Sequence, residues 1–194
     1  YQPQFPLVTA LRAELKLDFT AHTPLLETVD VEVQPMLAKF MDLDGPAVVH
    51  QAVAVQETLV EKVVSFLRRT ASWVEQRERN PEDEQLVRHL YDVHQLLPVV
   101  PQDPEAQRIR QQLFRRTVAG DQRKFGRKEP AFGSDARTWL EQALDQLQSS
   151  TEVEELYERF VGELVWGPAV PYSEASDRFT RLARELLAGL DPPA

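Results

Sequence analysis

The chain has 194 residues, 42% of them hydrophobic and 27% charged, a composition that predicts one large folded domain or two small ones. It contains no cysteine, which excludes disulfide bridges, thiolate chemistry and cysteine-based zinc or iron–sulfur sites. No apolar run approaches the eighteen residues of a spanning helix, and no Gly-rich phosphate loop is present. We therefore expect a cytoplasmic protein without membrane contact. The opening YQPQFP has neither Met nor a signal-peptide pattern, so we expect the natural protein to begin further upstream.

The net charge of −9 is distributed unevenly along the chain. Residues 1–60 and 131–194 are acidic, with net charges of −5 and −7, whereas residues 61–130 carry a net charge of +3. Within that middle part, residues 108–128 hold eight Lys or Arg beside one acid, Asp121. An acidic protein with one basic segment is expected to bind an anionic partner at that segment.

The first fifty-six residues are predicted to form strands and turns. Alternating or β-branched residues predict strands at 14–20 (ELKLDFT), 28–33 (TVDVEV) and 48–55 (VVHQAVAV), with a short helix at 36–41. So small a sheet has open edges and a face that needs cover. We expect the helices, or a further part of the protein, to provide that cover.

From about residue 57 onward, apolar residues recur at helical spacing. The first three helices are expected at about 57–73, 86–97 and 104–118, the last of them beginning after Asp103. Residues 120–135 are expected to be a loop, and three more helices follow. Their expected starting residues are Ser134, a Thr151–Glu154 capping box, and Ser173 or Ser176.

The predicted fold class is therefore α+β and mainly α. It consists of a two- to three-stranded sheet remnant in residues 1–56 and a five- to six-helix bundle in residues 57–194.

Lys62 lies beside the apolar stripe of its predicted helix rather than opposite it. One interpretation is that its stem packs at the edge of the core while the ammonium group reaches solvent. The other is a lysine held as a compact positive charge for a phosphate. Both remain open at this point.

The predicted helix 86–97 carries several polar side chains. Arg88 and Asp92 are four residues apart and can pair on one helix face. Asp92 is alternatively expected to pair with a neighbouring helix. His89 and His94 are five residues apart, which does not place two imidazoles on one face, so a metal pair there is not expected.

Asp18, on the first predicted strand, points away from the apolar side and by itself is a solvated carboxylate, although a strand carboxylate can hold a divalent cation.

Three segments, LKLDFT, ETLVEKVVSFLRRT and VRHLYDVHQL, occur in an order that resembles the nucleotidyltransferase AbiEii/AbiGii toxin family. That family is associated with type IV toxin–antitoxin and phage-abortive systems. Its pattern has an acidic residue on a strand, then an E-K-x-x-A-x-x-x-R helix, then an R-x-x-Y-D-L helix. In this sequence those positions correspond to Asp18, to Glu61-Lys62 with Arg68 or Arg69, and to Arg88, His89, Tyr91 and Asp92. QRKFGRK and ELYERFVGELVWG also look like the family, so the likeness covers most of the chain.

The sequence also departs from the family. The usual Gly-Gly or Gly-Ser turn and D-x-D metal motif are missing, and Asp18 stands where Glu is more usual. Asp42-Leu43-Asp44 matches the D-x-D pattern. However, it follows the Asp18 strand and precedes Gly45-Pro46, so we reject it as the metal motif. We therefore expect the chain to be the C-terminal part of a longer nucleotidyltransferase, inactive by itself.

The resemblance implies a mechanism for the complete enzyme. Mg²⁺ would be held by Asp18 and the D-x-D pair, and would orient a nucleoside triphosphate. Lys62 would contact the phosphates, with Arg69 and Arg88 also on the nucleotide. Asp92 would support the site or act as a base near the acceptor hydroxyl. The implied acceptor is RNA, with tRNA ends favoured, and an antitoxin protein is an implied partner.

The basic segment has two interpretations. Its cations can pair with the acidic C-terminal helices, or they can form a surface for an RNA backbone, with Phe125 placed to stack on a base. The cations of that surface are Arg115, Arg116, Arg123, Lys124, Arg127 and Lys128. The alternatives to an enzyme are a non-catalytic helical module that binds RNA or protein, and a plain helical scaffold.

Overall fold

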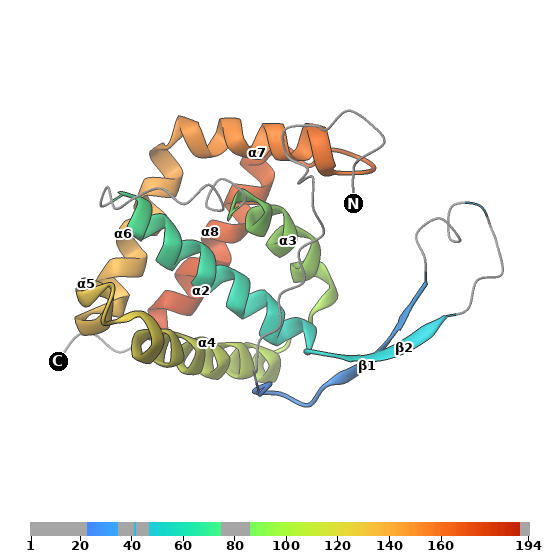
Figure 1. Cartoon of the computed structure of the whole chain (residues 1–194), viewed down its shortest axis with the longest axis horizontal. Coiled ribbons are helices and arrows are strands. Elements are labelled where there is room, and N and C mark those ends of the chain that lie inside the picture. The colour runs from blue at the N-terminus through green and yellow to red at the C-terminus, as the bar shows by residue number, and fades with distance from the viewer. Residues whose placement is uncertain (1–22, 35–40, 42–46, 75–85, 191–194) are drawn as a thin grey trace, which may run out of the picture.

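The computed structural model describes residues 23–34, 41, 47–74 and 86–190. Within them, two strands precede seven α-helices and one short 3₁₀ helix (Figure 1). The elements are β1 (Val29–Val33), β2 (Val48–Ala52), α2 (Val55–Val74), α3 (Arg88–Leu96), η2 (Leu97–Val99), α4 (Pro104–Phe125), α5 (Pro130–Ser134), α6 (Ala136–Ser149), α7 (Thr151–Leu164) and α8 (Tyr172–Ala188). The predicted α+β, mainly α class is confirmed. The predicted strand 14–20 and most of the predicted helix 36–41 lie outside the described residues.

β1 and β2 form an antiparallel pair in which Val31 faces His50. The pair projects away from the helices in Figure 1, and Val31 and Val33 remain 40% and 50% exposed. The described helices therefore do not cover the valines of the hairpin. The second strand ends at Ala52, three residues earlier than predicted, because α2 already begins at Val55.

Glu57, in the first turn of α2, ties the segment before β1 to the bundle. Its carboxylate is fully buried and accepts hydrogen bonds from the backbone N–H groups of Leu25 and Leu26 at 2.8–2.9 Å. A carboxylate with several backbone donors is a strong anchor because each bond is charge-assisted. This residue was not singled out from the sequence.

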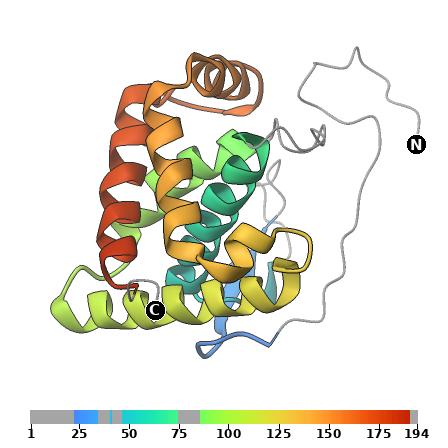
Figure 2. The same ribbon diagram turned by 90° about the vertical axis from the view of Figure 1, so that its left-hand side faces the viewer.

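The helical core is built around α2, which packs against α3, α4 and α6. Its apolar side chains recur at helical spacing and are almost completely buried, as expected for a central helix. They are Leu59, Val60, Val63, Val64, Phe66, Leu67 and Ala71. Phe66 meets Phe179 of α8 edge to face, with ring centroids 4.9 Å apart. Figure 2 shows α6 and α8 side by side, with α4 running across their lower ends.

The predicted loop at 120–135 is wrong, because α4 continues to Phe125 and α5 occupies Pro130–Ser134. Gly126 and Gly133 allow this compact arrangement. A Cβ placed on either glycine would lie 3.0 Å from the Cα of the other, so a side chain at either position would push the two backbones apart.

Three of the predicted helix starts are displaced. α8 begins at Tyr172 after Pro171, without a side-chain cap, rather than at Ser173 or Ser176. Asp135, rather than Ser134, caps α6 by accepting the N–H of Thr138 at 3.0 Å. Ser150, rather than Thr151, caps α7 by accepting the N–H of Val153. The cap of α4 is as predicted, with the Asp103 carboxylate accepting two backbone N–H groups. In the described part of the chain, no helix is both long and apolar enough to cross a bilayer.

Candidate functional site

Lys62 of α2 and Asp92 of α3 meet where the two helices pack together. The Lys62 Nζ lies 2.5 Å from Asp92 Oδ2, a charge-assisted hydrogen bond between residues thirty positions apart. The two side chains are 25% and 32% exposed, so the pair is at the edge of the core and within reach of solvent. The fold thus unites two residues that the sequence singles out on separate segments.

Asp92 does not form the expected ion pair with Arg88. Arg88 is exposed at the start of α3, whereas the carboxylate of Asp92 turns toward the neighbouring helix, as the alternative prediction stated. Burial by itself would raise the pKa of Asp92, but nearby His89 and the hydrogen bond and charge of Lys62 outweigh it, and the pKa is lowered. Asp92 is therefore ionised at neutral pH.

His89 lies near the same carboxylate oxygen that Lys62 binds. Its Nδ1 is 3.8 Å from Asp92 Oδ2, too far for a hydrogen bond, and this nitrogen has no hydrogen-bond partner among the described residues. Burial lowers the pKa of His89, and the charges of Lys62 and Arg88 add to that effect. Asp92 opposes it.

The remaining predicted nucleotide-binding residues are placed as follows. Arg69 is half-buried and lies seven residues after Lys62 on α2, two helical turns further along the same side. Arg88 lies one turn before Asp92. Asp18, the predicted metal ligand, lies outside the described residues. Among the described residues, no group of three or more His, Asp or Glu side chains could hold a metal ion.

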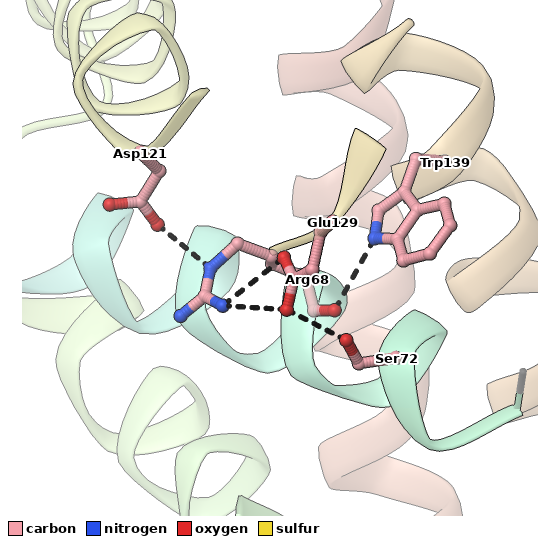
Figure 3. A network of polar contacts seen from close by, with 5 residues as sticks. All are labelled: Arg68, Ser72, Asp121, Glu129 and Trp139. Carbon is pink, nitrogen blue, oxygen red and sulfur yellow. Dashed lines mark hydrogen bonds and ion pairs between the residues drawn. The ribbon is translucent and has the colours of Figure 1, made fainter. Parts of the chain in front are cut away.

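Arg68, also on α2, is the centre of a buried polar network (Figure 3). Its guanidinium group donates to Asp121 of α4 at 3.1 Å and to Glu129 at 3.3 Å, and it lies 3.8 Å from the ring centroid of Phe125. Ser72 donates to the same Glu129 at 2.7 Å. The network fixes the end of α4, and the turn after it, to α2.

The network also engages the two acids that lie next to the cations of the basic segment. Asp121 is the only acid within residues 108–128, and Glu129 follows directly after them. Burial raises the pKa of Asp121, and Arg68 counters that rise. Arg68 pairs with both acids, and five cations of the segment remain exposed around them. Those exposed cations are Arg116, Arg123, Lys124, Arg127 and Lys128.

Arg115 differs from the other predicted RNA-binding residues. Its Nε donates to the backbone carbonyl of Gly189 at 2.7 Å, beside a parallel contact from Gln111 to Glu185. It therefore holds the C-terminal end of α8 through carbonyl groups rather than through an acidic side chain. The guanidinium group of Arg68 packs on the ring of Phe125, and the Lys124 Nζ lies 5.1 Å from the centroid of the same ring.

A family model described as nucleotidyl transferase AbiEii toxin, type IV TA system, matches residues 1–177 of the chain. The chain belongs to this family. Neither the search of curated proteins nor that of solved structures found a match.

The Lys62–Asp92 contact joins two segments that resemble the AbiEii family. The two residues come from two different family-like segments, ETLVEKVVSFLRRT and VRHLYDVHQL. The sequence left Arg68 and Arg69 as alternatives for the family arginine, and the structure separates their surroundings. Arg68 is 8% exposed and bound within the polar network, whereas Arg69 is half-buried.

Proposed function

We propose that this AbiEii-family chain takes part in the transfer of a nucleotide from a nucleoside triphosphate to an RNA acceptor. The observation that carries the proposal is the contact between Lys62 and Asp92, which leaves a lysine ammonium group at the edge of the core. Lys62 binds the phosphates, and Arg69 and Arg88 add positive charge on the same helices. Phosphoryl and nucleotidyl transfer depend mainly on such positioning and charge neutralisation.

Before a nucleotide binds, Asp92 keeps Lys62 in its ammonium form and holds it at the edge of the core. A carboxylate whose pKa is lowered is a poor proton acceptor, so we favour this supporting role over that of a base at the acceptor hydroxyl. We propose Asp18 as this chain's ligand for Mg²⁺. The bound ion would neutralise charge on the leaving pyrophosphate.

The acceptor in this proposal is RNA, with tRNA as the favoured class. Exposed cations supply most of the affinity of proteins for nucleic acid, and the segment from Arg116 to Lys128 carries five of them. An antitoxin partner, a role in phage defence and a cytoplasmic location follow from the type IV family and belong to the same proposal.

Binding of ATP and of inorganic tripolyphosphate, both with Mg²⁺, tests the nucleotide site by calorimetry. Replacement of Lys62 by Met removes one charged hydrogen bond of about 1.5–3 kcal/mol and should weaken binding by about ten- to a hundred-fold. The matched control is Arg108→Met, which removes one positive charge from an exposed ion pair with Glu105 on α4. Equal affinities for the Lys62 and Arg108 variants would contradict a phosphate role for Lys62.

Binding of total tRNA at several salt concentrations tests the acceptor surface. If about four cations contact phosphates, the log–log slope of affinity against salt should be near −3, from roughly −0.7 per contact on single strands. Joint replacement of Arg123, Lys124, Arg127 and Lys128 by Ser should flatten that slope. A control variant removes four other exposed cations, which are Arg108, Arg159, Arg181 and Arg184. RNA binding without nucleotide binding would favour the non-catalytic binding module.

A further inference from the structure

The contact between Lys62 and Asp92 leaves a problem for any phosphate that is to bind Lys62. A nucleoside triphosphate competes with Asp92 for the same ammonium group, because both are anions that accept its N–H donors. As Lys62 turns toward the phosphates, Asp92 loses the partner that lies 2.5 Å away. A carboxylate that is 32% exposed and loses its cation is only partly stabilised by solvent, so a second donor from the protein would stabilise it further.

His89 is the residue in position to replace it. Its Nδ1 lies 3.8 Å from the same oxygen, Asp92 Oδ2, that Lys62 binds. The imidazole is almost fully buried and this nitrogen has no hydrogen-bond partner in the described part of the chain, although buried polar atoms nearly always have one. A hydrogen bond requires an approach of only about 1 Å, which a small side-chain rotation supplies.

The charges around His89 favour protonation of its imidazole once the Lys62 ammonium group has turned away. Lys62 faces it from α2, and Arg88 and Asp92 face it from its own helix. Helix α8, which also packs on α3, brings its Glu174–Arg178 pair to His94 instead. Departure of the Lys62 ammonium group removes a repelling charge and leaves the attraction of Asp92, so His89 gains affinity for a proton at that moment.

We propose that His89 is a positioning residue that replaces Lys62 as the hydrogen-bond partner of Asp92 when Lys62 turns to the phosphates of a nucleotide. The inference rests on the proposed phosphate role of Lys62. It predicts that nucleotide binding and proton binding at His89 strengthen each other. Nucleotide affinity should therefore increase as the pH falls toward the pKa of His89, and the increase should be smaller in a His89→Asn variant.

The test measures proton affinity at each imidazole by NMR titration of the full 194-residue chain, which has only four histidines. The Lys62→Met variant imitates the departure of the ammonium group without any ligand. In it, the proton affinity of His89 should rise about tenfold, with its Nδ1 protonated. His94, five residues further along the same helix and also buried, is the internal control and should be unchanged.

A second pair of variants isolates the role of Asp92. If the rise comes from a hydrogen bond to Asp92, it should be lost when Asp92→Asn is compared with the double variant Lys62→Met/Asp92→Asn. An unchanged His89 in Lys62→Met, or an equal rise without Asp92, would overturn the inference. Should Lys62→Met fail to fold, the same titration of the wild-type chain saturated with Mg²⁺ and inorganic tripolyphosphate replaces it, again compared with Asp92→Asn.

The two proposals fail in different ways. If tripolyphosphate does not bind the wild-type chain, the nucleotide role of Lys62 fails, whatever His89 does in the Lys62→Met variant. If tripolyphosphate binds through Lys62 but His89 keeps its proton affinity, the nucleotide role stands and the positioning role of His89 fails.

Discussion

Arg68 should be among the residues on which the stability of the bundle depends most. Replacement by Met keeps most of the side-chain volume but removes the charge that Asp121 and Glu129 share (Figure 3). The side chains of these two acids are only 24% and 12% exposed, so solvent replaces Arg68 poorly. The variant also loses the contact with the Phe125 ring.

The loss of unfolding free energy in Arg68→Met follows from the exposed fractions of the two acids. Removal of one partner from a fully buried ion pair costs about 3–5 kcal/mol, and the remaining solvent access of both acids reduces this to roughly 2–4 kcal/mol. In a chain of this size each kcal/mol shifts Tm by about 2–4 °C, which gives a fall of roughly 5–15 °C. The double variant Arg68→Met/Glu129→Gln should regain part of the loss, because it removes the uncompensated charge of Glu129.

Thermal unfolding followed by circular dichroism measures these differences. Arg108→Met is the control, since an exposed pair contributes at most about 1 kcal/mol. The pH dependence provides a second check. Burial raises the pKa of Asp121 and Arg68 opposes it, so in Arg68→Met the pKa should rise further. The cost of an acid with a raised pKa is present above that pKa and disappears as pH falls toward 3.8, so the deficit of the variant should shrink on acidification. A variant within about 2 °C of wild type at neutral pH would refute this reasoning.

Three further predictions concern single contacts. In Glu57→Ala, the two backbone N–H groups that donate to the carboxylate should exchange hydrogen faster, whereas amides of α6 should keep their rates, as measured by hydrogen-exchange mass spectrometry. Burial lowers the pKa of His94, so the unfolded chain binds a proton below pH 6.5 before the folded chain does. Stability should therefore fall as pH drops through that value, and urea titrations of His94→Asn should show a smaller fall. Ser150→Ala should cost about 1 kcal/mol through loss of the α7 cap, and an equal cost for Thr151→Ala would contradict the assignment of that cap.

Periodicity was sufficient to predict the hairpin strands and the succession of helices, because burial of apolar faces decides both. Helix starts were harder to predict, since neighbouring residues such as Ser150 and Thr151 can each cap and only backbone geometry selects one. The region 120–135 was wrongly predicted because glycine usually signals a loop. Here Gly126 and Gly133 instead allow two helices to touch, which is a tertiary effect.

The sequence identified residues of the candidate site, but it did not predict which of them are in contact. Lys62 and Asp92 were both singled out, yet their meeting depends on how α2 and α3 rotate against each other, which a helical wheel does not fix. Arg68 carried a usable signal. It follows Val64 by four residues and precedes Ala71 by three, so its spacing places it on the buried side of α2. Its acidic partners lie more than fifty residues away, beyond the reach of any local pattern.

Helix α2 carries both Lys62 and Arg68, and this relates the two proposed surfaces. Six residues correspond to about 9 Å along the helix axis and to a rotation of roughly 240°, so the two side chains leave α2 in different directions. Lys62 meets α3, whereas Arg68 meets the end of α4 that carries the exposed cations. Since the two sites share no partner, loss of the ammonium group at Lys62 should weaken nucleotide binding without changing RNA binding, and the four-serine variant should do the reverse. In the combined variant, the nucleotide affinity should equal that of the Lys62 variant and the RNA affinity that of the four-serine variant, each within about 0.5 kcal/mol. A larger difference would mean that nucleotide and RNA meet at one continuous surface.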